Sequence, residues 1–255
     1  MMVCVAAALK ATCAEAAGPP PATPLWSGFY IGGNIGYGSG TSTGTTTVVE
    51  AFGVASLINQ ADATAGGIKG AIGGGQLGYN WQVSEHAVLG LEGDWQAAAG
   101  HTSRQFGGFL DAGQSASGPM TTNTQARILS FGTLRGRVGY AWDRLMLYGT
   151  GGLALGDLRL SGSVNEFVEL AGLDDLTLSW PFGGSKLRAG WTLGAGIEGA
   201  LTNNWTLKFE YLYLDFGSVS SSIAVTAPDT VGGTISTQAR FADNIWRIGL
   251  NYQFH

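Results

Sequence analysis

The fold is decided by the stretch Trp205-Thr206-Leu207-Lys208-Phe209-Glu210-Tyr211. Its odd positions are large and apolar, and its even positions are polar or charged. Side chains of a β-strand point alternately to opposite faces, so the stretch predicts a strand with one apolar face and one polar face. A helix would put Lys208 and Tyr211 on the same side and would have no clean apolar face.

The same two-residue period recurs along the chain and predicts eight strands. In the last one, Trp246, Ile248 and Leu250 share one face, and the residues between them are mostly polar. The range 144–161 is so rich in glycine that its alternation does not show which face is apolar. The expected ranges are 26–40, 67–83, 86–100, 128–142, 144–161, 185–201, 204–217 and 243–254.

The connections between these ranges alternate in length. Short turns at Ser84-Glu85, Asp143 and Thr202-Asn203 alternate with long polar stretches near 41–66, 101–127, 162–184 and 218–242. Short turns at one end and long loops at the other are typical of an outer-membrane barrel. The pattern predicts an all-β fold, an eight-stranded antiparallel up-and-down transmembrane β-barrel over residues 26–254, with four long extracellular loops.

The apolar faces of the strands are expected to contact lipid. The chain is 45% hydrophobic and only 12% charged, and no run reaches the roughly 18 apolar residues of a membrane helix. A transmembrane strand needs only about 9–11 alternating residues. No helices are expected that could cover the apolar faces of a soluble barrel. Aromatic residues gather at strand ends, as in an interfacial girdle; they are Trp26, Trp81, Trp142 and Trp205.

The polar faces are then expected to fill the lumen. They carry Glu92, Asp94, Arg135, Arg137, Arg188, Glu198, Lys208, Glu210 and Arg247. The interior of an eight-stranded barrel is just wide enough for side chains, and an unpaired buried charge is costly. We expect Glu92 and Asp94 to meet Arg135 and Arg137 across one strand pair. Lys208 and Glu210 should be matched by Glu198 and Arg247, which closes the lumen with ion pairs.

The N-terminal part indicates export. The short apolar run Val3 to Leu9 and the small-x-small pattern Ala14-Glu15-Ala16 predict a signal peptide over residues 1–17. The usual basic opening of such a signal is missing, so we expect the true start to lie upstream; a disordered Ala-rich tail is the alternative. A Pro-rich linker is expected over residues 18–25. Both cysteines lie before this linker, so no disulfide can hold the barrel together.

The C-terminal strand carries a second motif. Arg247, Gly249, Tyr252 and Phe254 are spaced as in the signal that the barrel-assembly machinery reads in a last strand. The chain ends in His255, where that signal usually ends in Phe. The alternative interpretation is one more amphipathic strand.

The opening strand, Trp26 to Tyr37 (WSGFYIGGNIGY), resembles that of the small outer-membrane β-barrel family of alphaproteobacteria, also called outer-membrane immunogenic or porin-like proteins. The run Tyr148 to Ala154 resembles the family's fifth strand, and the last strand is similar as well. The resemblance spans residues 26–255 without the long loops. It implies a monomeric or weakly oligomeric surface barrel in the cell outer membrane, and it carries no catalytic residues.

Other site types find little support. Gly73-Gly75-Gly78, Gly194-Gly196-Gly199 and Gly149-Gly151-Ala154 match a dinucleotide-binding pattern loosely, but none is followed by a helix. Glycine used for packing and curvature of the barrel explains them better. The net charge of −5 gives no support for a nucleic-acid partner. We expect no cofactor, no metal site and no catalytic residue.

Three functions are compatible with these sequence features. The first is a structural surface barrel with a filled lumen, which contributes to envelope integrity and surface contact. Its expected partners are outer-membrane lipid, lipopolysaccharide and, during insertion, the barrel-assembly machinery. The second is a narrow porin-like channel for small solutes. The third is a lipid-modifying enzyme of the outer leaflet, suggested only by His101-Thr102-Ser103, for which no orienting acid is evident.

Overall fold

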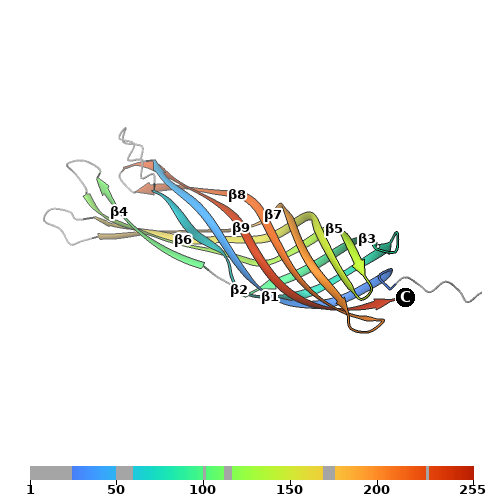
Figure 1. Ribbon diagram of the computed structural model, residues 1–255. Coiled ribbons are helices and arrows are strands. Elements are labelled where there is room, and N and C mark those ends of the chain that lie inside the picture. The colour runs from blue at the N-terminus through green and yellow to red at the C-terminus, as the bar shows by residue number, and fades with distance from the viewer. Residues whose placement is uncertain (1–24, 50–59, 100–101, 112–116, 169–175, 228–229) are drawn as a thin grey trace, which may run out of the picture.

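The computed structural model describes residues 25–49, 60–99, 102–111, 117–168, 176–227 and 230–255, and the expected signal peptide lies outside them. These residues form one elongated antiparallel sheet that closes on itself (Figure 1). Its strands are β1 (Gly28–Val49), β2 (Gln60–Gln82), β3 (Ala87–Ala98), β4 (Thr102–Asp111), β5 (Ser117–Trp142), β6 (Leu145–Val168), β7 (Leu176–Ala200), β8 (Trp205–Ala227) and β9 (Thr230–Phe254).

The barrel has eight strands, although nine are labelled. The strand order β3-β2-β1-β9-β8-β7-β6-β5 is closed by a ladder between β3 and β5. β4 pairs with the part of β5 that extends beyond the end of β3, so β3 and β4 are two pieces of one barrel strand. The predicted eight-stranded antiparallel up-and-down barrel is therefore confirmed.

The four stretches expected as long loops are mostly strand. The long strands contain 22 to 26 residues, which is at least twice the roughly 9–11 that cross a membrane. β1, for example, continues through the Thr-rich run to Val49. Thr and Val suit a pleated backbone, and paired strands satisfy each other's N–H and C=O groups outside lipid as well as inside it. The expected loops 41–66, 101–127, 162–184 and 218–242 are thus long hairpins in the described residues.

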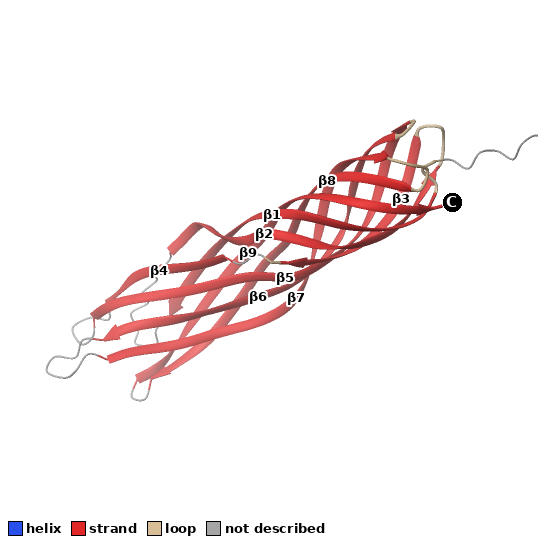
Figure 2. Cartoon of the chain, turned by 90° about the horizontal axis from the view of Figure 1, so that it is seen from below, coloured by secondary structure: helices blue, strands red, loops and turns tan. Residues whose placement is uncertain are grey.

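The barrel divides into two sheets at the long-hairpin end. The β7–β8 ladder stops at the Trp191–Asp215 pair, and the β2–β3 ladder stops at the Ile72–Ala98 pair. Past these pairs the described ladders join only β8, β9, β1 and β2 in one sheet and β4, β5, β6 and β7 in the other. The two sheets are visible as separate extensions at the far end of the closed barrel (Figure 2).

A belt of exposed apolar side chains surrounds the closed part. On β6 the outward leucines run from Leu145 to Leu155, and the next outward residues are Asp157 and Arg159. At about 3.3 Å per residue and a tilt near 40°, the leucine stretch rises about 25 Å, which matches the apolar band of a membrane barrel. No helix in the described residues is long and apolar enough to cross a membrane.

The aromatic girdle differs from the prediction at one residue. Trp81, Trp142 and Trp205 are exposed beside the short turns, where an interfacial ring is expected. Trp26 is instead only 1% exposed, and its indole Nε1–H donates to the carbonyl oxygen of Asp143 at 3.1 Å. Trp26 precedes β1 and turns inward because this bond satisfies its indole N–H. It closes the short-turn end of the lumen and is not part of the girdle.

The alternation of short turns and long hairpins predicts which end faces the outside. We expect Ser220→Cys, on the exposed part of β8, to react with a membrane-impermeant maleimide on intact cells. Asn203→Cys, in the short turn before β8, should react only after the outer membrane is opened. The native cysteines Cys4 and Cys13 precede the barrel and would be replaced in both variants. Labelling of position 203 on intact cells would contradict this orientation.

A charged network as candidate functional site

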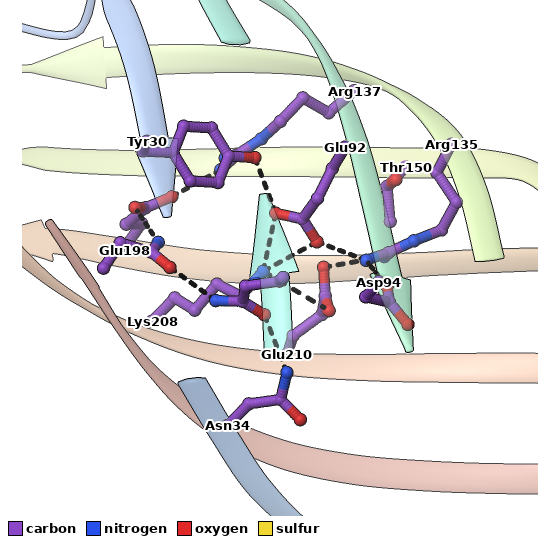
Figure 3. A network of polar contacts seen from close by, with 12 residues as sticks. Tyr30, Asn34, Glu92, Asp94, Arg135, Arg137, Thr150, Glu198, Lys208 and Glu210 are labelled. Carbon is purple, nitrogen blue, oxygen red and sulfur yellow. Dashed lines mark hydrogen bonds and ion pairs between the residues drawn. The ribbon is translucent and has the colours of Figure 1, made fainter. Parts of the chain in front are cut away.

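Charged side chains converge in the middle of the closed barrel. The inward face of β3 supplies Glu92 and Asp94, and the inward face of β5 supplies Arg135 and Arg137. Strands β7, β8 and β9 add four more, which are Glu198, Lys208, Glu210 and Arg247. All of them are buried. Figure 3 labels all of them except Arg247, and the labelled side chains point toward one another from different strands.

Glu92 lies at the centre of the network. Its carboxylate contacts the guanidinium of Arg135, which stands directly opposite in the β3–β5 register. It also accepts from Lys208 Nζ at 2.7 Å, from Arg247 at 3.3 Å and from the Tyr30 hydroxyl at 2.6 Å. Lys208 and Arg247 come from strands on the other side of the barrel. One carboxylate on β3 is therefore linked to its neighbour β5 and to three strands farther around the barrel, β1, β8 and β9.

Two further carboxylates share the same bases. Glu210 accepts from Arg135 at 3.0 Å and from Arg247 at 2.5 Å. Asp94 accepts from Arg135 at 2.8 Å and from Arg247 at 3.1 Å. The hydroxyl of Tyr148 also donates to Glu210 at 3.0 Å. Each guanidinium thus bridges three carboxylates, an arrangement that its planar fork of donors favours over a lysine ammonium.

A second, simpler pair lies beside this cluster. Arg137 donates to Glu198 at 2.6 Å, and the guanidinium lies 3.9 Å from the centre of the Tyr148 ring. The other partners of Glu198 are neutral: the Thr206 hydroxyl at 2.5 Å and the Asn251 amide at 2.9 Å. Arg137 also donates to the Tyr30 hydroxyl at 3.3 Å, so its burial is balanced by one carboxylate, one aromatic face and one hydroxyl.

Amides extend the network to the remaining strands. Gln76 on β2 accepts from the side chain of Asn34 on β1 at 2.9 Å and donates to Asn251 on β9 at 2.5 Å. Since Asn251 also donates to Glu198, the amides and the charges form one connected system. Each of the eight barrel strands contributes at least one side chain. The network braces the barrel from within.

The charges of the network balance one another, and its side chains are closed off from solvent. Four acids face four bases, and the paired side chains are at most 3% exposed. Among the described residues, no group of three or more His, Cys, Asp or Glu side chains could hold a metal ion. The arrangement can hold strands together and exclude water.

The structure brings together all but one of the residues expected in the lumen network. Arg188 faces inward farther along β7, opposite Gly156, but it is partly exposed and makes no ion pair in the described part of the chain. It lies above the level at which β7 and β8 separate, so water reaches it. A second difference concerns Arg137, which the sequence predicts to meet Glu92 or Asp94 but which pairs with Glu198. A third concerns Lys208. It stands opposite Glu198 in the register, yet its flexible ammonium reaches across the lumen to Glu92.

Two apolar layers that the alternation of the strands did not predict enclose the charges. The layer toward the long hairpins contains Ile72, Ile128, Phe131, Ala154, Leu158, Leu212, Leu214, Phe216, Phe241 and Ile245, and that at the short-turn end contains Trp26, Val88, Ala141, Met146, Tyr148 and Ala200. One signal was available: from Tyr211 to Phe216, apolar residues occupy both faces of the strand. An all-polar inner face is therefore wrong above and below the charges.

Glycines make room for the buried tyrosines of the network. A Cβ atom on Gly78 would lie 2.5 Å from the Tyr30 hydroxyl, and one on Gly196 would lie 2.5 Å from the Tyr148 hydroxyl. Such distances are far shorter than atoms tolerate, so both positions require glycine. The dinucleotide-like patterns that contain these two residues are accounted for by side-chain packing in β-strands.

The residues of the expected assembly signal lie on both faces of β9. Phe254 is exposed and Tyr252 is half-buried, and their rings stack edge to face on the outside of the barrel. Arg247 belongs to the network, and Gly249 lies against Lys208 and Gln76. Beyond the strand, His255 is exposed and contacts the carbonyl of Asn203.

Known proteins resemble this chain along most of its length. Residues 4–254 match the family model described as "Outer membrane protein beta-barrel domain". The chain is 37% identical over 242 residues to the 31 kDa outer-membrane immunogenic protein of Brucella melitensis biotype 1, covering 92% of this chain and 88% of that protein. It is 31% identical over 195 residues to the 22 kDa outer membrane protein of Rhizobium leguminosarum bv. viciae, covering 76% and 65%.

Similar solved structures include the outer membrane protein OprG from Pseudomonas aeruginosa and Ail, the attachment invasion locus protein of Yersinia pestis. OprG gives a TM-score of 0.44 at 14% identity and covers 90% of this chain and 96% of that chain. Ail gives a TM-score of 0.33 at 16% identity and covers 89% and 99%.

The pair between Arg137 and Glu198, in which each charge has a single ion-pair partner among the described residues, allows a test of the bracing. Removing either charge leaves the other buried and without its ion-pair partner. Arg137→Ala and Glu198→Ala should therefore each lower the free energy of unfolding by about 3–5 kcal/mol. The double variant should lose clearly less than the sum, because neither charge is then unpaired. Urea titration of the refolded barrel in lipid vesicles measures all three values.

Arg188→Ala is the matched control, because Arg188 lies on the same inner face of β7 but outside the network. Its effect should stay within about 0.5 kcal/mol. Strictly additive losses for Arg137 and Glu198 would show that the two side chains do not depend on each other.

Proposed function

Because the chain belongs to the outer-membrane β-barrel family that includes the Brucella outer-membrane immunogenic proteins, we propose that it is a structural surface barrel whose lumen is closed. The family match agrees with the resemblance carried by Trp26 to Tyr37, Tyr148 to Ala154 and the last strand. The protein resides in the cell outer membrane. Its contribution there is to envelope integrity and to contact at the cell surface.

The observation that carries the proposal is the network around Glu92. A conducting pore needs a continuous polar path, in which charged side chains remain hydrated. Here the carboxylates accept hydrogen bonds from arginine, lysine and tyrosine side chains of other strands. Opening a path for an ion would require several of these buried pairs to break together.

The apolar layers support the same conclusion. Phe131, Phe241 and Ile245 lie in the lumen on one side of the charges, and Trp26 and Met146 lie on the other. Close-packed apolar side chains offer water no hydrogen bonds and only small voids. Two such layers in series oppose the passage of ions and polar solutes.

The long hairpins supply the surface role. They continue the strands well past the apolar belt, so much of the chain stands outside the lipid. A braced barrel holds the bases of these hairpins in fixed positions. We propose that they make the surface contacts of the protein and that lipopolysaccharide surrounds their lower part.

The protein is further proposed to act as a monomer that the barrel-assembly machinery inserts. Within the belt each of the eight strands is paired on both sides, so no strand edge is free to join a second copy. Phe254 and Tyr252 face outward on the last strand, where an assembly factor could read them.

The alternatives have weaker support. A narrow channel would need the network to be hydrated. A lipid-modifying enzyme would need His101, which lies outside the described residues, to act with Ser103 on β4. An orienting acid for this pair is not evident from the sequence.

Conductance across planar bilayers tests the closed lumen. We expect the wild-type barrel to insert without stepwise current, because the ion pairs and apolar layers block the path. Arg135→Ala should loosen the network, since Arg135 bridges three carboxylates, and should produce brief openings. Arg188→Ala should remain silent. Sustained stepwise current from the wild type would favour the porin-like channel.

Truncation of the last strand tests the assembly signal. Deleting residues 253–255 removes the outward ring of Phe254 and should lower the amount of folded barrel in the outer membrane severalfold. Deleting His255 alone should have little effect, because it removes only an exposed contact. Folded protein is quantified by its heat-modifiable mobility in gel electrophoresis. Equal yields of the longer deletion and the wild type would contradict a role for this signal.

A further inference from the structure

The lipid-facing surface of β5, β6 and β7 changes abruptly at its border toward the long hairpins. On β6 the outward residues Leu153 and Leu155 are followed by Asp157 and Arg159. On β5 a β-bulge between Ile128 and Ser130 leaves Leu129 40% exposed, and the next outward residue is Arg127. The apolar belt therefore meets two arginines on neighbouring strands.

These two arginines face each other, and neither has a counter-ion among the described residues. Arg127 and Arg159 are directly opposite in the β5–β6 register, and both are exposed. Residues so placed have Cβ atoms about 4.5–5.5 Å apart, and like charges in this position are destabilising. In the described residues neither arginine makes an ion pair, and Asp157, one outward position down β6, makes none to them.

Another outward arginine beyond the apolar belt does have a carboxylate partner. Arg240 on β9 is 62% exposed, but its guanidinium donates to Asp215 on β8 at 2.6 Å. In the part of the barrel that the structure describes, one outward arginine thus has a carboxylate partner and the pair on β5 and β6 has none. A repulsive pair at an interface is accounted for if an anion from outside the chain lies between the two guanidiniums.

We propose that Arg127 and Arg159 form a binding site for the phosphate groups of the glycolipid in the outer leaflet, the lipopolysaccharide. Guanidinium groups donate parallel hydrogen bonds that match phosphate geometry. Just below them, Leu129, Leu155 and the 70% exposed Leu187 offer an apolar surface to acyl chains. Phosphate above and acyl chain below is the order in which such a lipid presents its groups. The site rests on the proposed orientation, with the long hairpins outside.

The experiment compares the purified refolded barrel with two variants. The first is the double variant Arg127→Gln/Arg159→Gln, and the second, the matched control, is Arg240→Gln. Native mass spectrometry in detergent measures the binding of lipid A that carries both phosphates, lipid A with the phosphates removed, and inorganic phosphate. The double variant should bind phosphorylated lipid A about tenfold more weakly or worse, as expected when charge-assisted contacts are lost. Arg240→Gln should bind like the wild type.

The other ligands identify what is recognised. Lipid A without phosphates should bind the wild type and the double variant equally weakly, and inorganic phosphate should not compete because it lacks acyl chains. Without lipid, the double variant should melt at the same or a higher temperature, since it removes a like-charge pair. This separates lost binding from misfolding.

The proposal would be overturned if the double variant bound phosphorylated lipid A as strongly as the wild type does. An equal loss of binding in Arg240→Gln would also overturn it. Displacement by inorganic phosphate at equal concentration would show a free-phosphate site instead. The closed lumen is tested separately by conductance, so either proposal can fail alone. Labelling of position 203 on intact cells would place these arginines on the periplasmic side and overturn the site.

Discussion

The structure depends on the pairing of charges that are buried inside the barrel. A carboxylate or guanidinium inside an eight-stranded barrel is stable only when an opposite charge or several hydrogen-bond partners lie within reach. Glu92 meets this condition through Arg135, Lys208, Arg247 and Tyr30. These partners come from four strands and lie 43 to 155 residues away from Glu92 in the chain. Satisfying one buried carboxylate therefore requires much of the barrel to be assembled in a single register.

That requirement explains details that local structure leaves open. A shift of the β3–β5 register by one residue would turn Arg135 to the lipid and bring an apolar side chain into the lumen. Glycines such as Gly78 and Gly196 stand where the rings of Tyr30 and Tyr148 pass close to a neighbouring strand. The network thus selects both register and residue size. Outside the lumen, where no such constraint acts, the barrel opens into two sheets.

The sequence predicted the fold because alternation is a local property that each strand displays by itself. The stretch from Trp205 to Tyr211 already showed which side chains face lipid and which face the lumen. The ends of the strands were mistaken for loops, since a Thr-rich run such as that in β1 has no apolar face yet remains paired. Trp26 was misplaced for a different reason: its inward turn depends on a carbonyl at Asp143, far along the chain. The contact between Lys208 and Glu92 likewise could not be predicted from the order of the strands, because the β7–β8 register places Lys208 opposite Glu198.

The central claim is that the charges in the lumen are dry and paired, and hydrogen exchange of the side chains tests it most directly. Two-dimensional NMR of the ¹⁵N-labelled barrel in lipid nanodiscs can follow the Nε–H protons of Arg135 and Arg247 after transfer to D₂O. Both donate within the network, to Thr133 and to Glu210. We expect their signals to persist long after that of the partly exposed Arg188 has vanished. Loss of all three at the same fast rate would show water in the lumen and contradict the account.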